Sequence, residues 1–303
     1  MHILVTGGSG FIGTALCRAL IARGDGVTVL TRDVARARQR LPQSVHCIDD
    51  LAQAAPAEAV VNLAGENLGD GRWSAARKQR FVDSRVQTTR RLIDWMQTGP
   101  RPQVLVSASA IGWYGARGDE ELGENASPGR PDEFSAQLCR AWEAEALQAE
   151  GLGVRTCLLR IGIVLERDGG SLQQLLLPFR LGLGGVMGSG AQWMSWIHRD
   201  DLVGLILWLI DTPQAQGAYN GTAPQPARHR EFVRTLARTL RRPALIPIPA
   251  PALRLLLGEM AGLVLEGQRV LPQRALRGGY VFRYPDLATA LAAILAPRRP
   301  QVH

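Results

Sequence analysis

The sequence of 303 residues has almost no lysine, which suggests a coding bias toward arginine as much as selection for a polyanionic partner. Lys78 is the only lysine, so the formal net charge of +8 rests almost entirely on arginine. The arginines are scattered apart from pairs at 90–91, 241–242 and 298–299, and no basic stripe with interleaved aromatic residues is present. A nucleic-acid partner, which would need such a stripe, is therefore not expected.

The sequence also lacks paired cysteines and long apolar runs. Cys17, Cys47, Cys139 and Cys157 stand far apart and form no C-x-x-C pair, so neither a disulfide framework nor a metal site is indicated. No apolar run reaches membrane-spanning length, and the chain starts on an apolar strand pattern without a charged leader or cleavage site. We therefore expect a soluble, cytoplasmic protein with reduced thiols and no membrane partner.

A glycine-rich turn lies between two apolar runs at the start of the chain. Residues 3–5 are predicted to form a buried strand, a helical pattern follows the turn, and a second apolar run lies at 27–30. This is the order of a βαβ dinucleotide-binding unit, whose glycines allow a sharp turn, close approach to a pyrophosphate and close helix packing. A Rossmann-like turn that binds no nucleotide is the alternative. The residues expected to bind the pyrophosphate at the helix start are Thr6, Gly7, Gly10, Phe11, Ile12 and Gly13.

No acidic residue stands at the end of the second apolar run, where Thr31-Arg32 is found instead. An acidic side chain there would bond to the ribose 2′-hydroxyl of NAD, whereas arginine suits the 2′-phosphate of NADP. Arg36 and Arg38 follow on the next predicted helix and would add to that site. The sequence therefore predicts NADP(H) over NAD(H). The alternative is that Arg32 is one of many surface arginines.

Apolar runs alternate with helical patterns through the first half of the chain. The runs lie at 45–48, 59–63, 103–107 and 154–161, and the helical patterns at 33–41, 75–96 and 134–148. This alternation favours an α/β fold with a Rossmann-type, doubly wound parallel sheet, in which ligands bind at the carboxyl ends of the strands. The residues that follow or end strands there, and are expected near a cofactor, are Leu63, Ala64, Gly65, Glu66 and Ser107.

The pattern loosens after about residue 165, where glycine- and proline-rich stretches begin. We predict a dinucleotide-binding Rossmann domain at 1–165, with residues 198–212 packing back on it. Residues 166–197 and 213–303 would form a smaller C-terminal α/β lobe that holds the substrate.

Several motifs together resemble the extended short-chain dehydrogenase/reductases of the epimerase/dehydratase branch. They are Thr6-Gly-Gly-x-Gly-Phe-Ile-Gly, Asn62-Leu-Ala-Gly, the strand end at Ser109, and Ser195-Trp-Ile-His-x-Asp-Asp. Further segments resemble an epimerase-like subfamily with a C-terminal domain of unknown function, some of whose members are linked to cell or plastid division. These are Asn62-Leu-Ala-Gly-Glu-Asn, Arg72-Trp73, Ser84-Arg85, 179–185, 192–198 and Phe282-x-Tyr-Pro. The resemblance covers nearly the whole chain and allows a homodimer, by analogy with relatives that pair through two long helices.

The chain departs from this family in lacking the Tyr-x-x-x-Lys pair that moves protons in short-chain dehydrogenases. None of its four tyrosines, Tyr114, Tyr219, Tyr280 and Tyr284, is followed by lysine at that spacing. The helix that contains Trp142-Glu143 puts Ser135 and Cys139 where the pair is expected, and neither can do this chemistry in the usual way.

Two residues are candidates for catalysis. Ser109 matches the family's catalytic serine, and Tyr114 is the only tyrosine near that strand end. Without a lysine partner, the pKa of Tyr114 should stay at about 10, which suits a pocket wall better than an acid–base group. The resemblance also implies that Arg160 and Gly162 lie beside the nicotinamide. Arg85, on the helix after the fourth strand, is expected to reach the cofactor or an anionic substrate, with a surface salt bridge as the alternative.

The sequence therefore predicts an NADP(H)-binding oxidoreductase or epimerase-like protein that acts on an unidentified small molecule. The missing Tyr-x-x-x-Lys pair leaves one alternative open. This is a regulator, for example of cell division, that binds NADP(H) with little or no catalysis.

Overall fold

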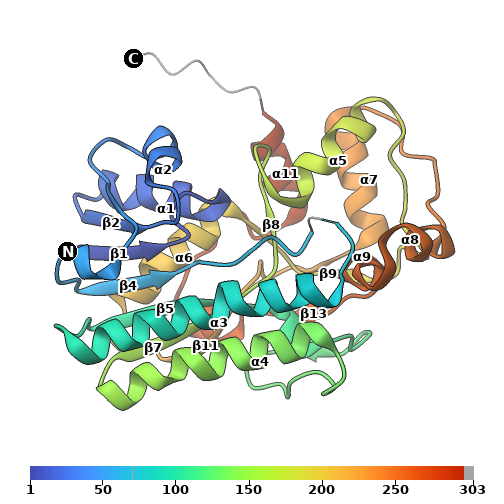
Figure 1. Cartoon of the computed structure of the whole chain (residues 1–303). Coiled ribbons are helices and arrows are strands. Elements are labelled where there is room, and N and C mark those ends of the chain that lie inside the picture. The colour runs from blue at the N-terminus through green and yellow to red at the C-terminus, as the bar shows by residue number, and fades with distance from the viewer. Residues whose placement is uncertain (70, 297–303) are drawn as a thin grey trace.

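Seven parallel strands form the central sheet of this computed structural model, which describes residues 1–69 and 71–296 (Figure 1). Each neighbouring pair of strands is parallel, and the chain winds outward in both directions from the boundary between β1 and β4. The predicted Rossmann-type, doubly wound sheet is confirmed. In spatial order the strands are β11 (Gly217–Gly221), β7 (Arg155–Ile161), β5 (Val104–Ala110), β4 (Ala59–Asn62), β1 (His2–Thr6), β2 (Gly26–Leu30) and β3 (His46–Ile48).

Helices cover both faces of this sheet, because side chains alternate along each buried strand. Ile3 and Val5 of β1 pack with α1 (Phe11–Ala22) and α6 (Arg199–Asp211), whereas Leu4 belongs to the core under α3 (Ala75–Thr98) and α4 (Phe134–Leu147). Figure 1 shows α3 and α4 side by side, on the face of the sheet opposite α1 and α6. The carboxyl ends of all seven strands therefore open on one edge, where the candidate site lies.

Side-chain caps fix where several helices begin. Ser74 accepts a hydrogen bond from the Arg77 backbone N–H at the start of α3, and Asp33 accepts one from Arg36 at the start of α2 (Val34–Arg40). Asp286 does the same for α11 (Leu287–Leu295). Each cap accepts from a first-turn backbone N–H that has no partner within the helix, which stabilises the fold by about 1 kcal/mol.

A second lobe forms around α5 (Gly170–Arg180), α7 (His229–Leu240) and α11, which share a separate apolar core. Leu176, Phe179, Phe232 and Leu291 are buried in it. The shorter strands are β6 (Glu121–Leu122), β8 (Ile163–Leu165), β9 (Trp193–Met194), β10 (Trp196–His198), β12 (Ala227–Arg228) and β13 (Arg269–Val270). The shorter helices are η1 (Leu51–Gln53), η2 (Ile111–Tyr114), η3 (Gln148–Leu152), α8 (Ala250–Leu257), η4 (Gly258–Ala261), α9 (Gly262–Leu265) and α10 (Gln273–Arg277).

The division of the chain differs from the expected one at β11. The sequence predicts residues 213–303 in the C-terminal lobe, but β11 pairs with β7 and is the edge strand of the main sheet. The chain therefore returns to the sheet once more before it enters the last part of the second lobe. Residues 297–303 of this prediction lie outside the described residues.

Within the described residues, no helix is both long enough and apolar enough to cross a membrane.

Candidate functional site

The glycine turn joins β1 to α1 by passing directly against the end of β4. Gly7 has a φ of 67°, and a Cβ atom there would lie 2.6 Å from the carbonyl oxygen of Leu63. A Cβ atom on Gly13 would overlap the Gly7 carbonyl oxygen. Both positions therefore need glycine for close backbone packing, as the sequence predicts.

The start of α1 is built to receive an anion. Gly10 is the N-cap residue and has no side chain to bond the first N–H groups, and no acidic residue stands in the first turn. The first N–H groups of any α-helix lack partners within it, here those of Phe11, Ile12 and Gly13. These donors and the helix dipole suit a phosphate. A Cβ atom on Gly10 would lie 3.1 Å from the Gly7 carbonyl oxygen, which is a tight contact, so glycine also keeps this position of the turn uncrowded.

The arginines after β2 are exposed, and one of them reaches this turn. Arg32, Arg36, Arg38 and Arg40 are all on the surface. Arg40 Nη1 is 3.5 Å from the Ser9 carbonyl oxygen, in the middle of the glycine turn. The sequence prediction named the first three of these residues and missed Arg40, although all four fall on or just before the same short helix.

Thr6 and Ser107 point into a buried chain of hydrogen bonds and not toward open space. Thr6 Oγ1 donates to Asn62 Oδ1 at 2.6 Å, and Asn62 Nδ2 donates to Ser107 Oγ at 3.3 Å and to Thr89 Oγ1 at 2.8 Å. The Ala64 backbone N–H also donates to Thr6 Oγ1, at 3.3 Å. These side chains hold the ends of β1, β4 and β5 together, and so fix the loop that begins at Leu63.

Arg85 lies beneath that loop. Its Nη2 donates to the Glu66 carbonyl at 2.9 Å and its Nη1 to the Phe81 carbonyl at 3.2 Å. A Cβ atom on Gly65 would be 2.8 Å from Arg85 Cζ, so the loop backbone rests on the guanidinium group. Burial lowers the pKa of Arg85 to about 10. The alternative of a surface salt bridge is wrong, because Arg85 is buried and its hydrogen bonds go to backbone carbonyls and to Ser84.

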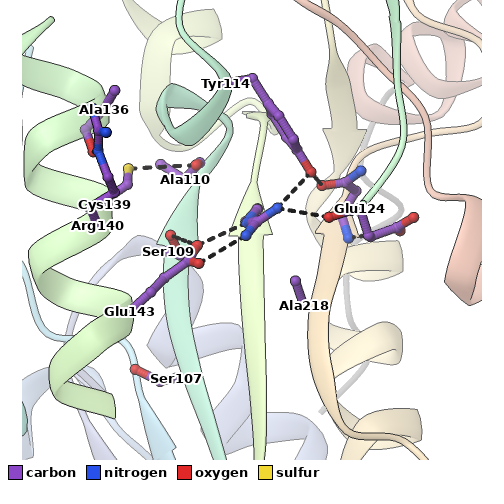
Figure 2. Close-up of polar contacts among 12 residues, drawn as sticks. Ser107, Ser109, Ala110, Tyr114, Glu124, Ala136, Cys139, Arg140, Glu143 and Ala218 are labelled. Carbon is purple, nitrogen blue, oxygen red and sulfur yellow. Dashed lines mark hydrogen bonds and ion pairs between the residues drawn. The ribbon is translucent and has the colours of Figure 1, made fainter. Parts of the chain in front are cut away.

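Ser109 donates its hydroxyl proton to a buried carboxylate. Figure 2 shows this residue at the end of β5 facing Glu143 on α4, and Ser109 Oγ lies 2.7 Å from Glu143 Oε1. Arg160 of β7 donates to the same carboxylate twice, from Nε at 2.8 Å and from Nη2 at 2.9 Å. All three residues are at most 4 % exposed. Arg160 therefore pairs with Glu143 beneath the strand ends instead of pointing out of the sheet.

Tyr114 extends this network toward the C-terminal part of the chain. Its hydroxyl accepts from Arg160 Nη1 at 3.0 Å and donates to Asn220 Oδ1 at 2.7 Å. Figure 2 labels Tyr114 and marks these contacts by dashed lines at its hydroxyl. Asn220 Nδ2 in turn donates to the Leu271 carbonyl at 2.9 Å. Burial raises the pKa of Tyr114, and the residue is 0 % exposed. This burial does not fit the expected contact between Tyr114 and a substrate.

Ser135 and Cys139 face the end of β5 from one side of α4, as their sequence position suggests. Cys139 Sγ is 3.5 Å from the Ala110 carbonyl oxygen, and a Cβ atom on Gly112 would be 3.1 Å from Ser135 Cβ. Burial raises the pKa of the Cys139 thiol to about 11, so it stays protonated at neutral pH. Lys78 is on α3, where it forms an ion pair with Glu259 and stacks on Phe134.

Gly162 lets two parts of the chain cross closely. Its N–H donates to the Gly221 carbonyl at 3.0 Å, and a Cβ atom there would overlap the Ser195 carbonyl oxygen. This close approach brings the segment before β10 against the end of β7.

Among the residues that the structure describes, no group of three or more histidine, cysteine, aspartate or glutamate side chains could hold a metal ion.

A doubly wound parallel sheet with a glycine turn after its first strand defines the class of Rossmann-type dinucleotide-binding folds. Residues 3–220 match the NAD dependent epimerase/dehydratase family, and residues 248–294 match a domain of unknown function, DUF1731. The chain belongs to the NAD dependent epimerase/dehydratase family. The predicted resemblance, including its C-terminal domain of unknown function, is confirmed.

Relatives match over nearly the whole chain. The chain is 42% identical over 305 residues to the chloroplastic SDR39U1 homolog of Arabidopsis thaliana, covering 97% of this chain and 87% of the relative. It is 39% identical over 302 residues to human epimerase family protein SDR39U1, covering 98% of this chain and 100% of the relative. A crystal structure of human SDR39U1 isoform 2 with NADPH superimposes with a TM-score of 0.89 at 38% identity, covering 97% of this chain and 99% of that one.

Proposed function

We propose that this chain binds NADP(H) at the glycine turn and acts as an oxidoreductase or epimerase-like protein of the extended short-chain dehydrogenase type. One observation carries the proposal. The start of α1 has no side-chain cap and no acidic residue in its first turn, and Arg40 of α2 reaches the glycine turn before it. A similar protein, human SDR39U1, was crystallised with NADPH, which supports the same cofactor here.

The residues that would hold the cofactor follow from this geometry. The backbone N–H groups of Phe11, Ile12 and Gly13 would bind the pyrophosphate, and Arg32 would bind the 2′-phosphate. The loop from Leu63 to Glu66, supported from below by Arg85, would line the adenosine side. NADP(H), when bound, supplies a site that accepts or donates hydride.

The polar groups at the end of β5 limit the chemistry that this chain can add. An ionised carboxylate can only accept, so the single proton of Ser109 is engaged by Glu143. The Ser109 oxygen keeps lone pairs for a ligand hydroxyl. Tyr114 is enclosed, so the proton that the substrate oxygen gains or loses with hydride transfer would have to be exchanged with bound water. We propose that the substrate lies between the sheet and the second lobe.

A pair of variants at Gly10 tests the cofactor site. Gly10 has a φ of −79°, which any residue adopts, and aspartate and serine can both cap α1. Both variants place a Cβ atom 3.1 Å from the Gly7 carbonyl oxygen, so they share the same steric cost and differ in charge. Gly10→Asp puts a negative charge where the pyrophosphate would bind. We expect calorimetric titration to show an NADPH affinity at least about 100-fold weaker in Gly10→Asp, or about 2.8 kcal/mol, and a smaller loss in Gly10→Ser. Unchanged affinity in Gly10→Asp would reject this site.

The regulator remains the alternative function, and turnover separates it from an enzyme. Tight NADPH binding without hydride transfer to any of a broad set of carbonyl metabolites would favour the regulator. Rapid turnover of one metabolite would exclude it.

A further inference from the structure

We infer that one surface of the second lobe docks on an anionic lipid bilayer, which it contacts without spanning it. Leu177, Leu181 and Leu183 at the end of α5, together with Leu245 and Ile246 on the connection from α7 to α8, form this surface, which we call the leucine face. The inference goes beyond the proposed function and does not depend on it. It departs from the expectation of no membrane partner, which rested on the lack of a spanning segment, because a surface contact needs no such segment.

Exposed apolar side chains are concentrated in this part of the chain. Within residues 1–69 and 71–296, eight of the twelve exposed large apolar side chains fall in 177–183 and 245–263. Five of them form the leucine face, and the others are Leu255 and Leu256 on α8 and Leu263 on α9. Leu245 is 83% exposed. Exposed apolar surface that gathers in one place, rather than scattering singly, marks an interaction site.

Two segments that are distant in sequence lie side by side in the leucine face. The Ile246 N–H donates to the Gly184 carbonyl at 3.3 Å, and the Ile248 N–H donates to the Val186 carbonyl at 2.9 Å. Leu177 and Leu181 are four residues apart, so they lie on the same side of α5. Figure 1 shows the connection from α7 to α8 at the edge of the second lobe, away from the central sheet. The two segments therefore join their exposed leucines into one surface.

The charged side chains of these segments are all arginines. Residues 169–199 and 232–258 contain no aspartate or glutamate. Within the part of the chain that the structure describes, four exposed arginines of these segments form no ion pair, and they are Arg180, Arg241, Arg242 and Arg254. Uncompensated positive charge beside exposed leucines matches a bilayer whose headgroups are negative and whose interior is apolar.

A second copy of the chain fits the leucine face less well. A symmetric dimer would bring the same surface of both copies together, so the arginines of one copy would face those of the other without an acidic partner. At a bilayer, by contrast, an arginine keeps its guanidinium group among the headgroups while its aliphatic stem and the neighbouring leucines reach the apolar layer. The charge therefore favours lipid as the occupant.

Vesicle co-sedimentation of the full-length protein tests this inference. We expect the wild type to bind vesicles of phosphatidylcholine mixed with phosphatidylglycerol, to bind phosphatidylcholine alone at least about tenfold more weakly, and to be released by added salt. Leu245→Ser should weaken binding to the mixed vesicles by roughly tenfold. The double variant Arg241→Gln/Arg242→Gln should weaken it by at least about tenfold.

Matched variants away from the leucine face control for general effects. Val281 is as exposed as Leu245, at 83%, and Arg18 and Arg91 are exposed arginines on α1 and α3. Val281→Ser and the double variant Arg18→Gln/Arg91→Gln should bind the mixed vesicles like the wild type. All variants should keep the wild-type midpoint of urea unfolding, because each changed side chain is exposed.

Three results would overturn the inference. The first is a wild type that does not sediment with the mixed vesicles at low salt. The second is binding that the control variants weaken as much as the leucine-face variants do. The third is a wild-type dimer in sedimentation velocity that Leu245→Ser dissociates, with no vesicle binding, which would make a second copy the occupant.

Discussion

The Ser109 hydroxyl donates to the Glu143 carboxylate across 2.7 Å, inside a network that Arg160 completes with two further hydrogen bonds. The sequence resemblance predicts Ser109 as the catalytic serine. Its only hydroxyl proton points to Glu143 on α4. Ser109 can therefore accept a hydrogen bond from a ligand but has no proton left to donate to one.

Removing the charge of Glu143 should destabilise the fold strongly. Glu143→Gln leaves Arg160 as a buried cation without its partner, which costs about 3–5 kcal/mol of unfolding free energy. Urea unfolding measures this loss. Arg130→Ala is the control, because Arg130 and its partner Asp132 are both 74% exposed. That variant should unfold at nearly the wild-type urea concentration, because an exposed ion pair contributes little, and a comparable loss in both variants would contradict the role given to the buried pair.

Tyr114→Phe should affect stability and spare cofactor binding. The variant removes one hydroxyl that accepts from Arg160 and donates to Asn220, so we expect a loss of about 1–3 kcal/mol in urea unfolding. The NADPH affinity from calorimetry should match the wild type, since this side chain is enclosed. A selective loss of NADPH affinity or turnover, at unchanged stability, would restore Tyr114 as a site residue.

Alanine variants at Gly7 and Gly24 distinguish the cost of backbone strain from the cost of steric overlap. Both have a positive φ, 67° and 88°, but a Cβ atom on Gly24 meets nothing within 4 Å, whereas one on Gly7 lies 2.6 Å from the Leu63 carbonyl oxygen. Substitution by alanine should cost about 1–2 kcal/mol at Gly24, from the left-handed conformation alone. Gly7→Ala should cost more and should also weaken NADPH binding. Equal melting temperatures for the two variants would show that the β1–β4 contact gives way easily.

His229 should make the protein less stable at acidic pH. Burial lowers the pKa of His229 to about 4, below the unfolded value of 6.5, so the unfolded chain binds the extra proton first as the pH falls. The stability contribution is complete above about pH 6.5 and is lost progressively toward pH 4, by about 3 kcal/mol in all. The stability difference between wild type and His229→Gln should therefore change between pH 7 and pH 4.5. A difference that stays constant over this range would contradict this role for His229.

Local sequence patterns predicted the parts of the fold that local patterns determine. The glycine turn, the first βαβ unit and the parallel sheet follow from apolar runs and glycine spacing between positions 3 and 30. The edge strand β11 was missed because its sequence, Gly-Ala-Tyr-Asn-Gly, has no apolar run and forms a strand only by pairing with β7. Tertiary pairing overrides weak propensity in such a segment.

The buried charges of the candidate site were harder to predict. Arg85 carried a usable signal, because it falls one turn from both Phe81 and Thr89 on the face of α3 that is buried. Glu143 likewise follows Cys139 by one turn on the inner face of α4. The sequence carries no such signal for the residues that Glu143 contacts. Arg160 and Tyr114 meet Glu143 and Asn220 only because separate strands end together, and this arrangement is not visible in residue spacing.

The central claim is that this chain binds NADP(H) at the glycine turn in preference to NAD(H). Calorimetric titration of the cofactor-free protein with NADPH and with NADH, repeated on Arg32→Ala, tests it most directly. The account predicts that NADPH binds at least about tenfold more tightly than NADH, and that Arg32→Ala removes most of this preference. Equal affinity for the two cofactors, or no binding of either, would contradict it.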